Sequence, residues 1–143
     1  FKETPDDAGH FDVVAHTGDQ LYLGYHSEQL MPPVVKAAAE TRGYMVTFDH
    51  DKNPATANDI TITPYFGNSA GKTLTWTQVW GGKNKPWLVP VEATYDKRDR
   101  KKLLGHGVGM SARDAAIRAK EEGLSWIDIL KYYYTGVAVE KIY

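Results

Sequence analysis

Residues 105–111 read Gly-His-Gly-Val-Gly-Met-Ser and place a single imidazole, that of His106, among three glycines. Glycines at this density indicate a backbone that approaches neighbouring chain closely or adopts positive φ angles. Ser111 is a suitable N-cap for a following helix, because Asp114 stands at the third helical position and Gly123 supplies a stop. The N-terminus of that helix would direct free N–H groups toward the imidazole. The pattern fits a rigid corner that binds hydroxyl or acyl groups, and it equally fits a packed turn whose histidine bonds a carbonyl.

Periodicity and turn residues outline the elements on both sides of this corner. Helices are predicted over 32–42, with Pro32 and Pro33 in the first turn, and after the N-caps Ser111 and Ser125. Alternating or β-branched stretches predict strands at 10–16, 20–25, 44–48, 60–66, 74–80, 87–95 and 137–143. The expected fold is a single α+β domain over residues 1–143, with mostly antiparallel strands and a few short helices.

Composition excludes several classes of protein. The 143 residues are 42% hydrophobic and 24% charged, which is a globular balance in a chain long enough for one core. A formal net charge of −1 argues against a strongly basic nucleic-acid binder. No apolar run approaches the roughly 18 residues that a membrane-spanning helix needs. The absence of cysteine excludes disulfides, thiolate zinc sites, iron–sulfur clusters and a cysteine nucleophile. Because residue 1 is Phe1 instead of methionine, the chain is expected to be a processed or trimmed product.

The loop at residues 66–73 imitates a phosphate-binding loop, because it follows a predicted strand and ends in Gly-Lys-Thr. A phosphate loop requires glycine where Phe66 stands and a helix directly after the loop. Residues 74–80 instead alternate like a strand, which favours a tight hairpin turn. Nucleotide binding stays as an alternative for this loop.

Metal sites are not indicated by the sequence. Asp49, Asp51 and Asn53 have the spacing that begins a calcium loop, but Pro54 and Ile60 stand where that loop requires glycine and glutamate. The five histidines show no spacing that a helix or strand would turn into a metal clamp. We therefore expect no metal and no cofactor.

Two further features suit polymer binding. Residues 97–102 read Lys-Arg-Asp-Arg-Lys-Lys, a charge run that favours a solvated turn and, as the alternative, contact with an anionic polymer. Trp76, Trp80 and Trp87 have faces that stack on sugar rings and polar edges that bond hydroxyls. The competing interpretation of the tryptophans is that they pack in or beside the core.

Several of these residues together resemble the C-terminal signature of the SpoIID domain, the family of stage II sporulation protein D and the LytB amidase enhancers. The signature is carried by residues 105–111, Ala115-Ala116, Gly123, Ser125-Trp126, Ile129-Leu130 and residues 132–136. Earlier matching elements, in the family's order, are Asp19-Gln20 with Tyr22 and Gly24, residues 39–43 and 63–66, Asn68-Ser69, Gly71, Thr73, residues 79–82 and 86–88, and Asp96. The chain departs from the family at Ala112-Arg113-Asp114, where many members have Gln followed by Tyr-Gly.

The resemblance implies work on peptidoglycan outside the cytoplasm, in the cell envelope or as a secreted protein. Family members resemble lytic transglycosylases, which cleave glycan strands and prefer strands stripped of stem peptides, and others enhance amidases. Cleavage needs a general acid for the glycosidic oxygen and a base for the attacking muramic hydroxyl. The family's catalytic glutamate lies upstream of the Asp19-Gln20 element. The chain is therefore expected to lack the family's N-terminal segment, and the role is not carried onto Glu28.

Residue types and the resemblance together give the expected substrate contacts. These are Ser69, Lys72 and Thr73 on the glycine loop, His106, Gly107, Gly109 and Ser111 at the corner, and Trp80 or Trp87 as a stacking ring. His106 is expected to orient the substrate or to act as an auxiliary acid or base, no residue is assigned as the catalytic one, and Asp96 is expected to hold the corner loop or to assist catalysis.

The expected partners are peptidoglycan glycan strands and a cell-wall amidase or other hydrolase, with no nucleic acid and no transmembrane segment. The alternative function is a non-catalytic module that binds glycan or enhances an amidase. Cleavage of glycan strands by the complete protein would indicate the first function, and binding without cleavage would indicate the non-catalytic module.

Overall fold

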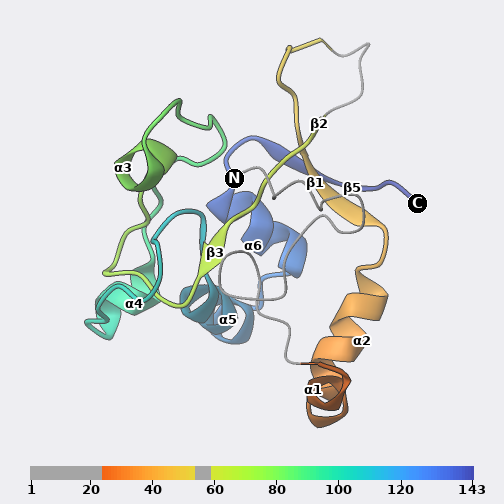
Figure 1. Ribbon diagram of the computed structural model, residues 1–143. Helices are drawn as coiled ribbons and strands as arrows, with labels where there is room; N and C mark the ends of the chain where they lie inside the picture. Colours follow the sequence, from red (N-terminus) through yellow and green to blue (C-terminus); the bar gives the residue numbers. More distant parts are fainter. Residues whose placement is uncertain (1–23, 54–58) are drawn as a thin grey trace. The chain divides into compact units, whose positions relative to one another are not determined.

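The computed structural model describes residues 24–53 and 59–143 (Figure 1). The chain divides into two compact units, residues 1–42 and 43–143. The first unit contains α1 (Tyr25–Leu30) and α2 (Pro32–Glu40), and the helix predicted at 32–42 is confirmed. The strand predicted at 10–16 and residues 20–23 of the next one lie outside the described residues, whereas Tyr25 begins a helix. Among the described helices, none combines the length and apolar character required to cross a membrane.

The beginning and the end of the second unit pair in a three-stranded antiparallel sheet. Its order is β2 (Asp59–Ile60), β1 (Tyr44–Phe48) and β5 (Val137–Lys141). The strand predicted at 44–48 is confirmed, and the one predicted at 137–143 is confirmed over 137–141. Gly43 directly precedes β1 with a positive φ of 82°, and its carbonyl accepts the Ile142 N–H at 2.7 Å. A Cβ at Gly43 would lie 2.0 Å from the Tyr143 carbonyl oxygen, so only glycine fits there.

Two capped helices pack next to each other in this unit (Figure 1). The Ser111 side chain accepts the Asp114 N–H at the start of α5 (Ala112–Glu121), and Ser125 forms a capping box with Asp128 at the start of α6 (Trp126–Tyr133). Both predicted N-caps are confirmed. The buried core residues are Trp87, Leu88, Val108, Ala115, Ile129, Tyr133, Tyr134 and Val137. The α+β class, with mostly antiparallel strands and short helices, is confirmed as well.

The strand predicted at 74–80 is wrong, because α3 (Trp76–Trp80) forms there. Thr75 caps this helix in a capping box with Gln78, and one helical turn brings the Trp76 and Trp80 ring centroids within 4.5 Å. In a strand, residues four positions apart would lie about 13 Å apart, so this ring contact requires the helix. Local capping and ring packing thus outweigh the alternating sequence pattern.

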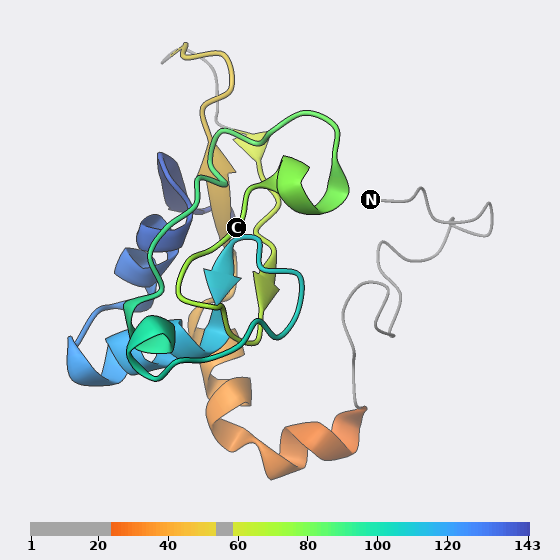
Figure 2. The ribbon, with the colours of Figure 1, turned by 90° about the vertical axis from the view of Figure 1, so that its left-hand side faces the viewer.

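The strands predicted at 60–66 and 87–95 form only in part. Between β2 and β3 (Tyr65–Phe66) the regular strand is interrupted, although the Thr61 N–H still donates to the Val46 carbonyl of β1 at 3.0 Å. Pro64 has no N–H to offer to a neighbouring strand, and its carbonyl accepts hydrogen bonds from Met110 N–H and Tyr134 O–H. Residues 94–98 instead form α4 (Thr94–Arg98). The β3 strand pairs in parallel with β4 (Met110–Ser111), and the two lie side by side in Figure 2.

Candidate functional site

The glycine segment, residues 105–109, lies against the loop at residues 67–74. Leu104 donates its N–H to the Asn68 carbonyl at 2.8 Å, and Leu74 donates to the Gly107 carbonyl at 2.8 Å. The two stretches are also bridged at Leu74 and Val108. The sequence motifs at 67–73 and 105–111 therefore lie side by side.

Close packing explains why glycines are required in this segment. A Cβ at Gly109, which has a φ of 79°, would lie 2.0 Å from the Pro64 carbonyl oxygen. A Cβ at Gly107 would lie 2.9 Å from Leu74 Cδ1. The predicted close approach of the backbone is thus confirmed. Gly107 and Gly109 are buried, so they serve packing in this structure and do not line its surface.

A buried carboxylate joins the glycine segment to the loop. Asp96 Oδ2 accepts hydrogen bonds from the Ser69 N–H at 2.7 Å, the Ser69 hydroxyl at 3.0 Å and the Ser111 hydroxyl at 2.7 Å. Asp96 Oδ1 accepts from Arg113 at 3.1 Å. Burial by itself would raise the pKa of Asp96, but these hydrogen bonds outweigh it and hold the pKa below its ordinary value. The carboxylate therefore stays ionised at neutral pH.

Three of the predicted contact residues consequently lie inside the unit. Ser69, Ser111 and Asp96 are fully buried, and each of the two serine hydroxyls donates to Asp96. Thr73 is buried as well, because its N–H donates to the Val91 carbonyl and its hydroxyl accepts the Val91 N–H. Their side chains hold neighbouring segments together and do not reach a ligand at the surface. Of the expected functions of Asp96, this arrangement matches holding the corner loop.

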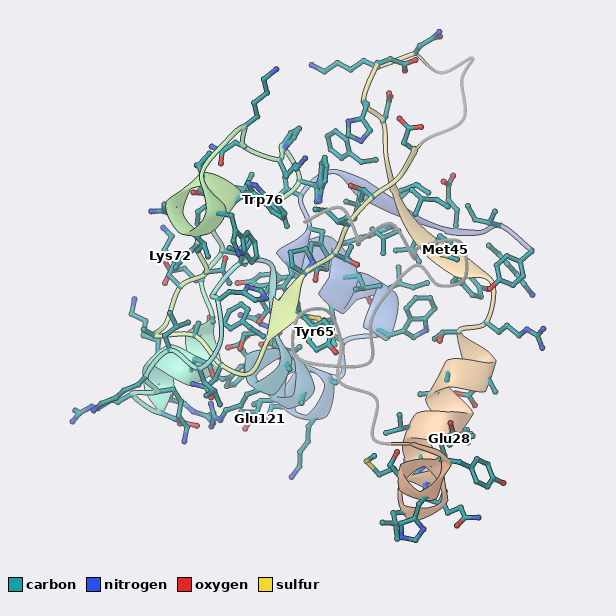
Figure 3. All side chains as sticks on the ribbon, viewed as in Figure 1. Glu28, Met45, Tyr65, Lys72, Trp76 and Glu121 are labelled. Carbon is teal, nitrogen blue, oxygen red and sulfur yellow. The ribbon has the colours of Figure 1, made fainter. Side chains whose placement is uncertain are left out.

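Lys72 is the predicted loop residue whose side chain reaches the surface. Its Nζ lies 3.7 Å from Glu92 Oε1, in an exposed ion pair. An open pocket of about 530 Å³ lies beside it, lined by Lys72, Thr73, Leu74, Gln78, Val89 and Pro90. Figure 3 shows Lys72 and Trp76 on the same side of the second unit. His106 is not among the residues that line this pocket.

The loop at 67–73 offers no cradle for a phosphate. The N–H groups of Gly67 and Asn68 donate to the Leu104 carbonyl, that of Ser69 donates to Asp96, and that of Gly71 donates to Ser69 Oγ. The helix that follows begins only at Trp76, and a carboxylate already occupies the position in which an anion would meet the loop amides. These bonds argue against nucleotide binding at this loop.

His106 is half-buried and its imidazole is held by the backbone. Nδ1 accepts the Val108 N–H at 3.1 Å, and because an N–H can donate only to an unprotonated nitrogen, the ring proton is on Nε2. Burial lowers the pKa of His106, although an interaction with the Tyr65 backbone partly opposes this. A neutral, fixed ring suits an orienting and stacking role better than proton transfer.

The aromatic face consists of Trp76, Trp80 and His106. The Trp80 ring lies 4.9 Å from the imidazole, measured between centroids, and Trp80 is 46% exposed. Trp87, the other tryptophan predicted to stack on sugar, is 4% exposed and donates its Nε1–H to the Ile62 carbonyl. Trp87 is thus a core residue, and Trp80 is the ring available to a ligand.

Sequence analysis missed the contribution of Arg113 and Asp114, which stand where the chain departs from the SpoIID pattern. Arg113 bonds Asp96 and also Asp99. Asp114 accepts the Tyr95 N–H at 2.7 Å and pairs with Arg118 at 2.7 Å, so it anchors α4 to α5. The four-residue spacing of Asp114 and Arg118 on a predicted helix was the available signal for this pair.

Across residues 24–53 and 59–143, no group of three or more histidine, aspartate or glutamate side chains is placed to hold a metal ion. In the stretch that imitates a calcium loop, Asp49 and Asp51 accept backbone N–H groups of Lys52 and Asn53.

Comparison with protein-family models gives no match, and comparison with curated proteins also gives none. The SpoIID resemblance therefore stays a prediction from residues 105–111 and the other matching elements.

We expect Asp96→Asn to destabilise the protein by about 3 kcal/mol. The substitution leaves Arg113 without its buried carboxylate partner, and it places an amide NH₂ group, itself a donor, among the donors that surround Asp96. Urea unfolding followed by tryptophan fluorescence measures the change. Asp99→Asn is the matched control: its carboxylate also pairs with Arg113 but is partly exposed to solvent, so the expected loss is smaller than that of Asp96→Asn. Equal losses in the two variants would contradict the central role of Asp96.

The lowered pKa of His106 predicts a pH dependence of stability. Below the unfolded-state pKa of about 6.5 the unfolded chain binds more protons, so the free energy of unfolding falls as pH drops toward the folded-state pKa. His106→Asn retains an acceptor without a titrating group, and it should flatten this decline in urea unfolding between about pH 7 and pH 5. His26→Asn, at an exposed position of α1, is the control. An unchanged slope in His106→Asn would contradict the prediction.

Proposed function

We propose that the aromatic face binds the sugar rings of peptidoglycan glycan strands, and that the chain is part of a SpoIID-type domain acting outside the cytoplasm. The observation that carries the proposal is the exposed ring of Trp80, fixed 4.9 Å from the half-buried His106. The faces of tryptophan rings bind the apolar faces of sugars, while nearby polar groups bond the hydroxyls.

Rigidity behind the aromatic face supports this role. Trp80 packs on Trp76 at 4.5 Å, and the imidazole packs on the buried ring of Phe66 at 5.6 Å. The backbone that carries His106 is tied to the loop at 67–74, whose Ser69 bonds Asp96. A surface that is ordered before binding loses little conformational entropy when the ligand arrives.

Polar groups flank the exposed ring. Within and just after α3, the Thr77 hydroxyl donates to Asn84 Oδ1 at 2.7 Å, and both residues are accessible to solvent. Lys72 and Gln78 line the open pocket nearby. This mixture of one exposed ring with hydroxyl, amide and ammonium groups suits a carbohydrate ligand.

Glycan cleavage enters the proposal through the SpoIID resemblance alone. The reaction needs a protonated carboxyl beside the glycosidic oxygen. The two buried carboxylates of the second unit, Asp96 and Asp114, are each engaged in an ion pair with an arginine. We therefore assign glycan binding to residues 43–143 and assign the catalytic step to none of the residues described above. An interaction with a cell-wall amidase or other hydrolase is the non-catalytic alternative.

Trp80→Ala should weaken binding to glycan strands at least about fivefold, because stacking of a ligand ring on an aromatic side chain, as in single-stranded nucleic-acid sites, contributes on the order of 1–3 kcal/mol. Co-sedimentation with peptidoglycan stripped of stem peptides measures the affinity. Trp126→Ala is the control, since this ring is also exposed, at 39%, but packs on Tyr44 beside the sheet. Equal affinities of Trp80→Ala and the unmodified protein would contradict the aromatic face.

The chain of 143 residues should bind denuded glycan strands without creating new anhydromuramic ends. Asp96 is ionised and buried, so it has no proton to donate to a glycosidic oxygen. Mass spectrometry of strands incubated with the protein detects such ends. Their appearance would show that the chain carries its own general acid, and would favour the transglycosylase function over the non-catalytic module.

A further inference from the structure

Three consecutive cations of the charge run at 97–102 have no partner within the part of the chain that the structure describes. Lys97 pairs with Glu92, and Arg98 pairs with Asp99 and Glu121. The remaining three form what we call the basic turn: Arg100, Lys101 and Lys102. All three are exposed, and no ion pair or ring contact engages their side chains.

The backbone of the basic turn is fixed. Arg100 N–H donates to the Lys97 carbonyl at 3.1 Å, and Lys101 N–H donates to the Asp96 carbonyl at 2.9 Å. The Lys102 carbonyl accepts a hydrogen bond from the Asn68 side chain. The cations thus extend from a backbone that is anchored both to α4 and to the loop at 67–74.

The basic turn leads directly into the aromatic face. Lys102 is followed by Leu103 and Leu104, which are both exposed, and Leu104 pairs with Asn68 two residues before His106. Figure 2 shows the cyan segment after α4 passing beside β3 on its way to β4. An extended ligand that contacts His106 can therefore continue along residues 100–104.

The charge of this turn is a local excess. The whole chain carries a formal net charge of −1, and the acidic neighbours Asp99, Glu121 and Glu92 are already paired with other cations. At physiological salt an exposed charge acts over about 8 Å, so the turn attracts anions that are held close to it.

We propose that the basic turn and the aromatic face form one extended site for an acidic glycan, a sugar chain that carries free carboxylates. The sugar rings stack on Trp80, and the carboxylates approach the ammonium and guanidinium groups of residues 100–102. The inference rests on the proposed function and adds the charge of the ligand. Proteins that bind nucleic acid neutralise many phosphates, whereas three cations without an ion pair in the described residues, on a chain whose formal net charge is −1, suit a polymer with sparser charge.

This site is tested by measuring the affinity of the protein for glycan strands at several salt concentrations. The probe is peptide-stripped glycan strands, and the neutral comparison is the same strands with amidated carboxylates. The test variant is Arg100→Gln/Lys101→Gln/Lys102→Gln. The matched control is Arg42→Gln/Lys120→Gln/Lys131→Gln, which removes one arginine and two lysines that are also exposed and without ion pairs in the described part of the chain. Duplex DNA is the competing polymer, and Trp80→Ala is measured in parallel.

The test variant should bind the acidic strands about tenfold more weakly than the control at about 50 mM NaCl, with the difference lost at about 500 mM. Neither triple variant should change the affinity for amidated strands. Equal affinities of the two triple variants for acidic strands would overturn the inference while leaving stacking on Trp80 in place. Equally tight binding of duplex DNA, lost in the test variant, would overturn the assignment to a glycan.

Two further outcomes separate this inference from the proposed function. A loss in the test variant together with full binding by Trp80→Ala supports the basic turn and contradicts the aromatic face. Failure of the unmodified protein to bind either form of the strands overturns both.

Discussion

The carboxylate of Asp96 lies where three distant parts of the chain meet. It is provided by α4, it accepts two hydrogen bonds from Ser69 in the loop and one from Ser111 at the start of α5, and it pairs with Arg113. A buried carboxylate is costly unless it is paired and fully hydrogen-bonded, and here both oxygens have donors. The same carboxylate holds the loop at 67–74 and the start of α5. The glycine segment, which precedes β4 and packs against that loop, therefore has little conformational freedom.

This arrangement divides the polar and aromatic side chains of the motifs into two layers. The small polar side chains are buried and hydrogen-bonded inside the unit: Ser69, Thr73 and Ser111. The larger side chains, Trp80, His106 and Lys72, reach solvent from the backbone that the inner layer holds. Hydroxyl groups that resemble substrate ligands in a sequence can thus act as internal supports, and the ligand surface is then made of rings and cations.

Local signals in the sequence predicted the helices well, and distant contacts explain where prediction failed. Ser111 with Asp114 and Ser125 with Asp128 identify helix starts because the capping bonds are made within four residues. The helix α3 was missed because alternation at 74–80 masks a capping box at Thr75.

The start of α4 depends on Asp114, which lies 19 residues away from the Tyr95 N–H that it accepts, and no local pattern reports such a bond. The glycines at 105–109 predicted a close approach of the backbone, but they did not identify the segment that it meets. The burial of Asp96 was not predicted either, since an aspartate beside a charge run looks like a surface residue.

The antiparallel pairing of β1 with β5 also bears on how the unit assembles. Thr47 on β1 hydrogen-bonds Glu140 on β5 across a separation of 93 residues, whereas Asn68 reaches the Lys102 carbonyl across 34. Closing a longer loop costs more chain entropy and slows folding. We therefore expect the middle of the chain to gain its contacts first during synthesis, with the sheet completed only when the last strand leaves the ribosome.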